Sequence, residues 1–242
     1  MKRYGQYCPV ARAAEILAER WTLLVIRELL WGEDRFTGIA RGLPRMSPSL
    51  LAARLRELQR AGLVQRHVVD GEPRYRLTPA GAELEPLLKQ MAMWGARWMH
   101  ELRPDEFDPV LLMLQIRRES QSVRMPEQAT TVQVHFRDAP TGQQRWWLVL
   151  SRSGGVDVCD SYPGFPVSVW LETEVSILTR IWMGDMTWSA ALRDEVLSLT
   201  GDHAACRALP TWLHVSPFAA VERAPVSLPR WPNQASSSGA PL

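Results

Sequence analysis

The sequence contains little cysteine and no long hydrophobic run. Its three cysteines, at positions 8, 159 and 206, fit neither a zinc site nor a disulfide framework. The longest apolar candidate, WTLLVIRELLW, contains Arg27 and Glu28 and is too short to span a membrane. The N-terminus lacks the hydrophobic segment of a signal peptide. These absences predict a reduced, cytoplasmic protein with no membrane segment, no metal and no cofactor.

The common catalytic signatures are also absent. The histidines at 67, 100, 135, 203 and 214 are scattered, and there is no HExxH motif, nucleophile elbow or glycine-rich phosphate loop. Asp202 and His203 lie at a predicted strand-to-helix turn, where aspartate is most readily explained as a helix N-cap. We therefore identify no catalytic residue and expect a protein that is not an enzyme.

One stretch, SPSLLAARLRELQRAGLV, predicts a short amphipathic helix over residues 47–60. Ser47 is a good N-cap, Pro48 suits the first helical position, and Gly62 ends the helix. The spacing places one set of residues toward a core and another set on the opposite face. The first set is Leu51, Leu55 and Leu58; the second is Ser49, Ala53, Arg56 and Arg60, with Arg54 on a flank. Taken alone, this pattern also fits a solvated surface helix.

The neighbouring segments favour a nucleic-acid-binding module. Upstream, RFTGIARGLPRM predicts a shorter helix and a tight connection, which together with 47–60 make a helix-turn-helix. Downstream, two alternating segments around Asp70-Gly71 predict a β-hairpin. Residues 35–76 hold nine arginines against three carboxylates, a formal charge of +6, whereas the whole chain sums to +2. A concentrated positive charge is typical of nucleic-acid binding.

Residues 4–102 closely resemble the HxlR-type winged-helix transcription regulators. The matching blocks are the Cys-Pro at 8–9, the Glu-Arg-Trp-Thr at 19–22, the Arg-Phe helix, the Ser-Pro helix and the Leu-Thr-Pro-Ala-Gly at 77–81. The resemblance implies a bacterial, dimeric protein that inserts residues 47–60 into the major groove of double-stranded DNA. We expect groove contacts from Ser47, Ser49, Ala53 and Arg56, with Arg54 and Arg60 on the flanks. Arg45, Arg66, Arg74 and Arg76 are expected on phosphates or in the minor groove.

Cys8 is a candidate redox site. Backbone N–H groups at a helix N-terminus favour a thiolate, and some HxlR-type proteins use a cysteine here to sense oxidants or electrophiles. The alternative is a small packing residue.

The helix expected after Thr78-Pro79 is a candidate dimer element. Apolar residues recur in it at spacings of three and four, namely Leu84, Leu87, Met91, Trp94, Trp98 and Leu102. The resemblance implies that this helix pairs with its mate. The alternative is packing against the second half of its own chain. Nearer the N-terminus, the segment 21–31 is apolar on almost all sides, which predicts the buried central helix of the first domain.

The second half predicts an α+β domain with helices covering one face of a mainly antiparallel sheet. Strands are expected at 130–137, 145–151, 155–161, 167–173 and 197–202, and helices at 174–184, 187–196 and 203–213, the last broken by Pro210. Residues 165–215 resemble the C-terminal half of sterol carrier protein type-two-like domains, some of which enclose an apolar ligand tunnel. The large side chains of this half either line such a pocket or fill the core. The pocket candidates are Trp146, Trp147, Trp170, Leu178, Trp182, Met186 and Trp212.

The sequence thus predicts an α+β chain with two domains and a tail. Residues 1–103 are expected to bind DNA and dimerise, 108–224 to form a sterol-carrier-like ligand-binding domain, and 225–242 to be disordered. The predicted function is a homodimeric transcription regulator whose DNA affinity responds to a hydrophobic small molecule. The alternative regulator senses oxidants through Cys8 and has a purely structural second domain. Two weaker alternatives are an enzyme, for which catalytic motifs are missing, and a scaffold that uses the winged helix for protein contacts, against which the basic hairpin argues.

Overall fold

The computed structural model describes residues 4–120, 125–225 and 228. The chain forms two compact units, 1–91 and 92–242, so the division falls inside helix α6 (Glu85–Trp98) and not at the predicted boundary, 102–110. This difference has a structural cause. The backbone N–H groups of Ala224 and Leu228 donate to the carbonyls of Arg97 and Trp98, which joins the last turn of α6 to the second unit. The predicted tail, 225–242, lies outside the described residues except at 225 and 228.

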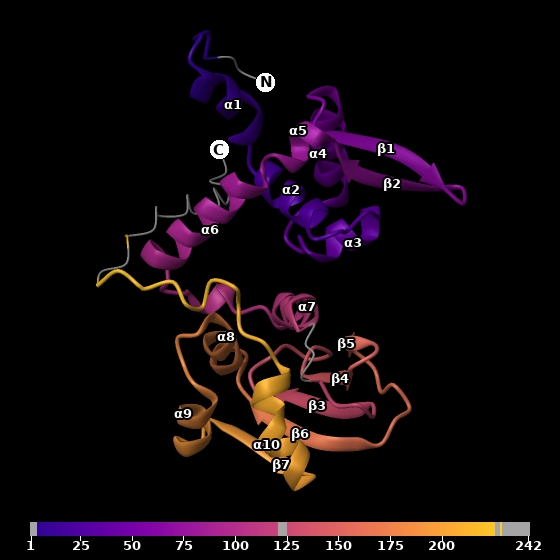
Figure 1. Cartoon of the computed structure of the whole chain (residues 1–242), viewed down its shortest axis with the longest axis vertical. Helices are drawn as coiled ribbons and strands as arrows, with labels where there is room; N and C mark the ends of the chain where they lie inside the picture. The colour runs from indigo at the N-terminus through magenta and orange to yellow at the C-terminus, as the bar shows by residue number, and fades with distance from the viewer. Residues whose placement is uncertain (1–3, 121–124, 226–227, 229–242) are drawn as a thin grey trace, which may run out of the picture. The chain divides into compact units, whose positions relative to one another are not determined.

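The first unit is a winged helix with the predicted order of helices and hairpin (Figure 1). Its core is formed mainly by α2 and α4, which contribute Val25, Ile26, Leu51, Leu55 and Leu58, each at most 1% exposed. Its elements are α1 (Pro9–Leu17), α2 (Thr22–Leu30), α3 (Phe36–Arg41), α4 (Pro48–Arg60), β1 (Val64–Val69), β2 (Glu72–Leu77), α5 (Pro79–Ala82) and the start of α6.

The helix predicted to run on from Thr78 is in fact two helices, α5 and α6. The Thr78 hydroxyl caps α5 by accepting a hydrogen bond from the Gly81 N–H at 3.1 Å, as expected. The chain then turns at residues 83–84 before α6 begins. Pro86 explains the break, because it has no N–H to donate to the Ala82 carbonyl four residues earlier.

The second unit is built on a five-stranded sheet of order β5-β4-β3-β6-β7. The β3–β6 pair is parallel and the other three pairs are antiparallel, so the predicted mainly antiparallel sheet is confirmed. The elements are the 3₁₀ helix η1 (Pro104–Glu106), α7 (Pro109–Glu119), β3 (Thr130–Phe136), β4 (Arg145–Ser151), β5 (Gly155–Cys159), β6 (Val167–Thr173), α8 (Val175–Met183), α9 (Trp188–Arg193), β7 (Leu197–Gly201) and α10 (His203–Trp212).

The helices of this unit share one core with a single face of the sheet. In β4, for example, Trp146, Leu148 and Leu150 are buried, while the alternate residues Trp147 and Val149 are only partly covered. α7, α8, α9 and α10 add their apolar residues to the same cluster. The predicted arrangement, helices covering one face, is confirmed.

Two local predictions in this unit need correction. No helix is predicted at α7 from the sequence, although Asp108 and Pro109 supply an N-cap and a first helical residue. The Asp108 carboxylate accepts hydrogen bonds from the backbone N–H groups of Val110 and Leu111. α10 is not broken by Pro210 but continues to Trp212. Pro210 lies in the last turn, where it removes one hydrogen bond, and burial of Leu209 and Trp212 holds the turn in place.

Candidate nucleic-acid interface

α4 begins and packs as the sequence predicts. The Ser47 hydroxyl accepts a hydrogen bond from the Leu50 N–H at 3.3 Å, and Pro48 occupies the first helical position. Gly62, just past the end, has the positive φ of +74° that favours glycine. The predicted leucine face is buried. This packing fixes the direction in which the opposite face points.

The opposite face of α4 is open to solvent. Ser49, Arg56 and Arg60 are exposed, and Ala53 is partly exposed. The face therefore presents small side chains near the N-terminus of the helix and guanidinium groups toward its end. Small residues allow close approach of a helix backbone to base edges, and arginine binds guanine or phosphate in a bidentate manner.

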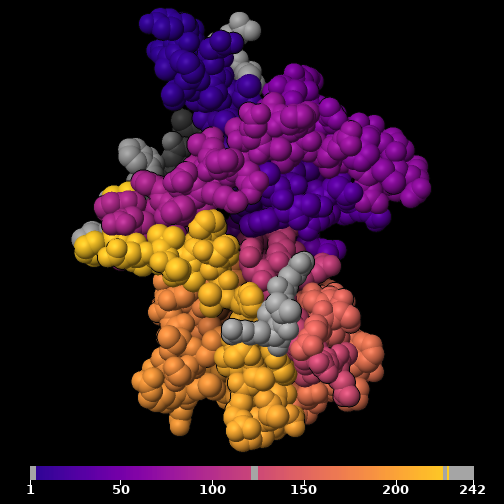
Figure 2. Space-filling view, in the orientation of Figure 1, coloured from indigo at the N-terminus to yellow at the C-terminus, as the bar shows by residue number. Residues whose placement is uncertain are grey.

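The hairpin β1–β2 forms a wing that projects from the helices of its unit (Figure 2). Asp70 and Gly71 both have positive φ, +52° and +80°, as a two-residue type I′ turn requires. Arg66 and Arg76 are exposed on the wing, and Arg76 Nη2 donates to Gln65 Oε1 at 3.3 Å. Arg45 is exposed in the turn between α3 and α4.

Arg54 is bound within its own unit. Its Nε donates to the Arg20 carbonyl at 3.1 Å, Nη2 lies 3.1 Å from Glu19 Oε2, and Nη1 pairs with Glu57. The side chain is 14% exposed. Arg54 therefore joins α4 to the segment before α2, and its charge is compensated.

Arg74 is held in a similar way. Its Nη1 lies 2.7 Å from Asp34 Oδ1, and its side chain is 15% exposed. The sequence alone does not distinguish Arg54 and Arg74 from the other arginines, because their partners Glu19 and Asp34 are distant in sequence. Glu19 and Asp34, just ahead of α2 and α3, were the available signal. The structure thus separates Arg54 and Arg74 from the exposed arginines, which are Arg45, Arg56, Arg60, Arg66 and Arg76.

α6 exposes much of its predicted apolar face. Leu87, Met91 and Trp94 are 45%, 48% and 51% exposed, and no residue of the helix is buried. Leu84 lies just before α6 and packs on the core of the first unit, and Trp98 is partly buried. Apolar side chains are also exposed at the N-terminal end of the chain, where Tyr7 before α1 is 97% exposed and Val10 in α1 is 76% exposed.

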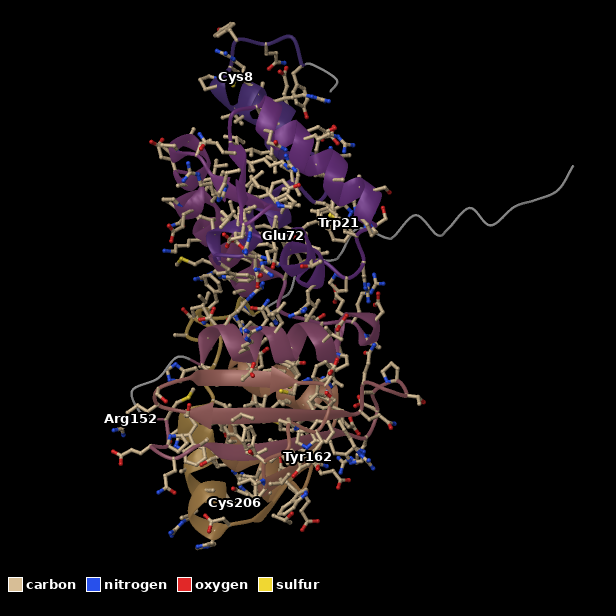
Figure 3. All side chains as sticks on the ribbon, turned by 90° about the vertical axis from the view of Figure 1, so that its right-hand side faces the viewer. Cys8, Trp21, Glu72, Arg152, Tyr162 and Cys206 are labelled. Atoms are coloured by element: carbon tan, nitrogen blue, oxygen red, sulfur yellow. The ribbon has the colours of Figure 1, made fainter. Side chains whose placement is uncertain are left out.

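The three cysteines are free thiols in different surroundings. Cys8 is the N-cap residue of α1, is partly exposed, and lies at the outer end of that helix (Figure 3). Burial raises the pKa of the Cys159 thiol, and the Asp157 and Asp160 carboxylates raise it further. Burial also raises the pKa of the Cys206 thiol, as does Asp202. Cys159 and Cys206 are therefore poor sources of thiolate.

The predicted pocket residues do not surround one cavity within the described residues. Trp146, Leu178 and Trp212 are buried in the core, with Trp182 and Met186 packed against it. Trp147 and Trp170 lie on the other face of the sheet, where Trp147 contacts Tyr162 edge-on at 6.2 Å between centroids and Trp170 is 45% exposed. The cavity beside Trp182 measures about 10 Å³, which is room for one water molecule at most.

The described part of the chain offers neither a cluster of metal ligands nor a membrane-spanning helix. No three His, Cys, Asp or Glu side chains gather there as a set of metal ligands. None of its helices combines the length and the apolar character needed to cross a membrane.

Residues 16–103 match the family model described as HxlR-like helix-turn-helix. YvaP of Bacillus subtilis, an uncharacterized HTH-type transcriptional regulator, is 37% identical over 99 residues, 39% of this chain and 92% of YvaP. The uncharacterized regulator sll1512 of Synechocystis is 34% identical over 100 residues, 40% of this chain and 74% of that protein. The solved reduced form of YodB from B. subtilis shares 33% identity over 37% of this chain and 92% of its own, with a TM-score of 0.34. The chain belongs to the HxlR-like helix-turn-helix family of DNA-binding transcriptional regulators.

Proposed function

We propose that the protein is a homodimeric regulator that reads DNA with α4 and holds the backbone with its wing. The observation that supports this most directly is the exposed face of α4, which combines Ser49 and Ala53 with Arg56 and Arg60. In this assignment Ser47, Ser49, Ala53 and Arg56 contact base edges in the major groove. Arg60, Arg66 and Arg76 bind phosphates, and Arg45 lies beside the sugar-phosphate backbone of the DNA.

Arg54 and Arg74 receive a different role in this proposal. Both are largely buried and paired with carboxylates, so moving either to a phosphate would break existing contacts. We assign them to holding α4 and β2 in position. Their effect on DNA binding is therefore indirect.

The homodimer is proposed from the exposed apolar side chains of α6. Leu87, Met91 and Trp94 recur at spacings of four and three, so they line one side of the helix. Burying such a stripe against a second copy removes apolar surface from water. A two-fold axis then presents two α4 helices to two half-sites.

The second unit is proposed to be a sterol-carrier-like sensor of a small molecule. The order β6, α8, α9, β7, α10 is the order of elements expected from the resemblance over 165–215. Among the described residues, the cavity beside Trp182 has room for only about 10 Å³, so in this proposal the effector binds away from the tryptophans. A ligand alters DNA affinity only if it favours one arrangement of the dimer over another.

The experiment that tests this function is a binding selection on random duplex DNA, followed by fluorescence anisotropy with the selected sequence. We expect a pseudo-palindromic site with two half-sites, bound by a dimer, and an affinity that falls steeply with salt. Selection of a single half-site by a monomer would contradict the dimer. If the selection enriched no particular sequence, the assignment of α4 to base contacts in the major groove would be contradicted.

A second candidate function is thiol-based sensing through Cys8. The observation in its favour is the position of Cys8, which is the N-cap residue of α1 and is partly exposed. In this candidate function the second unit is structural, and oxidation of Cys8 changes DNA affinity.

A further inference from the structure

A pocket of about 460 Å³ lies in the second unit, next to the end of α6. One wall is the segment that follows α6, and another is the C-terminal end of α8. This volume lies within the range of small-molecule sites. The lining residues are His100, Glu101, Leu102, Phe107, Arg180 and Asp185.

The charges in this pocket are unequally compensated. The Asp185 carboxylate accepts a hydrogen bond from Arg223 Nε at 3.0 Å, and both side chains are less than one-third exposed. Glu101 also has an interaction partner. Arg180 is exposed and forms no ion pair within the described part of the chain. Its guanidinium is therefore the cation available to a ligand.

The remaining lining groups are apolar or able to form hydrogen bonds. Leu102 and Phe107 are partly buried, and Phe107 also packs against the core of the unit. His100 Nε2 lies 3.1 Å from the Ala224 carbonyl oxygen. Because a carbonyl only accepts, Nε2 carries the proton and Nδ1 is the ring nitrogen not used in this bond.

We propose that this pocket binds a small organic carboxylate with an apolar body. The ligand carboxylate forms a bidentate ion pair with Arg180, and the apolar body covers Leu102 and Phe107. This inference rests on the proposed sensor function, because it names the site and the chemical class of the effector.

The pocket is connected to α6 through Arg223. Its Nη1 donates to the Ala96 carbonyl at 2.8 Å, and its Nη2 donates to the Met183 carbonyl at 2.9 Å. One guanidinium therefore joins the last turn of α6, the last turn of α8 and the pocket residue Asp185. A ligand that moves the pocket wall acts on α6, and α6 is the helix proposed to pair in the dimer.

The test is isothermal titration calorimetry on the full chain without DNA. The probes are octanoate and 4-phenylbutyrate, with octanamide and 4-phenylbutyramide as neutral analogues of the same shape. Arg180→Ala removes the cation. Arg193→Ala is the matched control, since Arg193 is an exposed arginine at the end of α9, outside the pocket.

We expect both carboxylates to bind, with the amides at least about tenfold weaker. Arg180→Ala should weaken carboxylate binding by about tenfold or more, while Arg193→Ala leaves it unchanged. The proposal is overturned if neither carboxylate binds, if the amides bind equally well, or if the two variants lose the same affinity.

DNA binding measured on the same preparation separates the two proposals. A protein that binds DNA but neither carboxylate overturns the pocket and leaves the regulator function intact. A protein that binds the carboxylates through Arg180 but binds no DNA overturns the regulator function alone. Carboxylate binding that leaves DNA affinity unchanged overturns the connection through Arg223.

Discussion

Arg74 and Asp34 form an ion pair at the base of the wing, with Nη1 2.7 Å from Oδ1. The Tyr75 N–H also donates to the Asp34 carbonyl at 2.8 Å. Asp34 therefore holds β2 by both its side chain and its backbone. Two residues along the same strand, Arg76 is exposed, and its Nη2 donates to the neutral Gln65 side chain at 3.3 Å.

This difference predicts unequal effects of two arginine substitutions on DNA binding. Arg76→Ala should weaken binding to all sequences and reduce the slope of log affinity against log salt by about one. Arg74→Ala should change that slope much less, because its charge is already compensated by Asp34. Anisotropy titrations at several salt concentrations measure both slopes. Equal reductions would show that Arg74 leaves Asp34 in the complex.

A second pair of substitutions compares two arginines of α4. Arg54→Ala should lower the free energy of unfolding by about 1 kcal/mol, because it removes the hydrogen bond from Arg54 Nε to the Arg20 carbonyl. The half-exposed partners Glu19 and Glu57 add little to that value. Arg56→Ala should cost under about 0.5 kcal/mol and weaken discrimination between operator and random DNA.

Urea denaturation and competition with random DNA measure the two quantities separately. A stable Arg54→Ala protein that has lost sequence discrimination would return Arg54 to the DNA interface.

Gly81 is predicted to tolerate no larger residue. A Cβ at this position would lie 2.2 Å from the Leu63 carbonyl oxygen and 3.0 Å from a methyl group of Leu77. Gly81→Ala should therefore destabilise the protein by about 2 kcal/mol through overpacking. Ala80→Ser, which adds an atom at the exposed neighbouring position, should stay within about 0.5 kcal/mol of the natural chain. Thermal or urea unfolding that ranks the two variants equally would contradict the close approach.

The dimer can be tested at the centre of the exposed α6 stripe. Trp94→Glu keeps a good helix former but places a charge where apolar surface is expected to be buried. The dissociation constant of the dimer should rise by about tenfold or more. Lys89→Ala removes an exposed side chain of the same helix that pairs with Glu85, and it serves as the control. Light scattering over a concentration series should show a monomer for the first variant only.

Cys8 gives the redox prediction. If Cys8 senses oxidants, hydrogen peroxide should release the natural protein from DNA and leave Cys8→Ser bound. Cys159→Ser should release like the natural protein, because burial and two carboxylates keep its thiol protonated. Anisotropy before and after oxidation measures the release. The same peroxide-dependent release in Cys8→Ser would eliminate this candidate function.

Much of the fold could be predicted from the sequence because the local signals agree with one another. Ser47, Pro48 and Gly62 mark the ends of α4 in the sequence, and Asp70-Gly71 marks the turn of the wing. Such signals act within a few residues and need no knowledge of the tertiary structure. The same kind of signal, Asp108-Pro109, marks α7 but was hidden by the apparent linker around it.

The sequence could not show which charges compensate each other. Arg54 and Glu19 are 35 residues apart, and Arg74 and Asp34 are 40 apart. The packing of α4 on α2, and of β2 beside α3, brings these pairs together. The pocket could not be predicted for the same reason: Arg180 and the segment 100–107 are distant in sequence and meet only in the folded second unit. Of the candidates chosen from the sequence, Trp146, Leu178 and Trp212 are core residues, whereas Trp170 is 45% exposed on the other face of the sheet.

Arg223 joins α6 to α8, but it is synthesised long after the residues of α6. The ribosome completes the winged helix long before it reaches residue 223. Until then, the last turn of α6 lacks the guanidinium that joins it to α8 and to the pocket. In a nascent chain the residues of the winged helix are therefore all present before Arg223 can join the last turn of α6 to the last turn of α8.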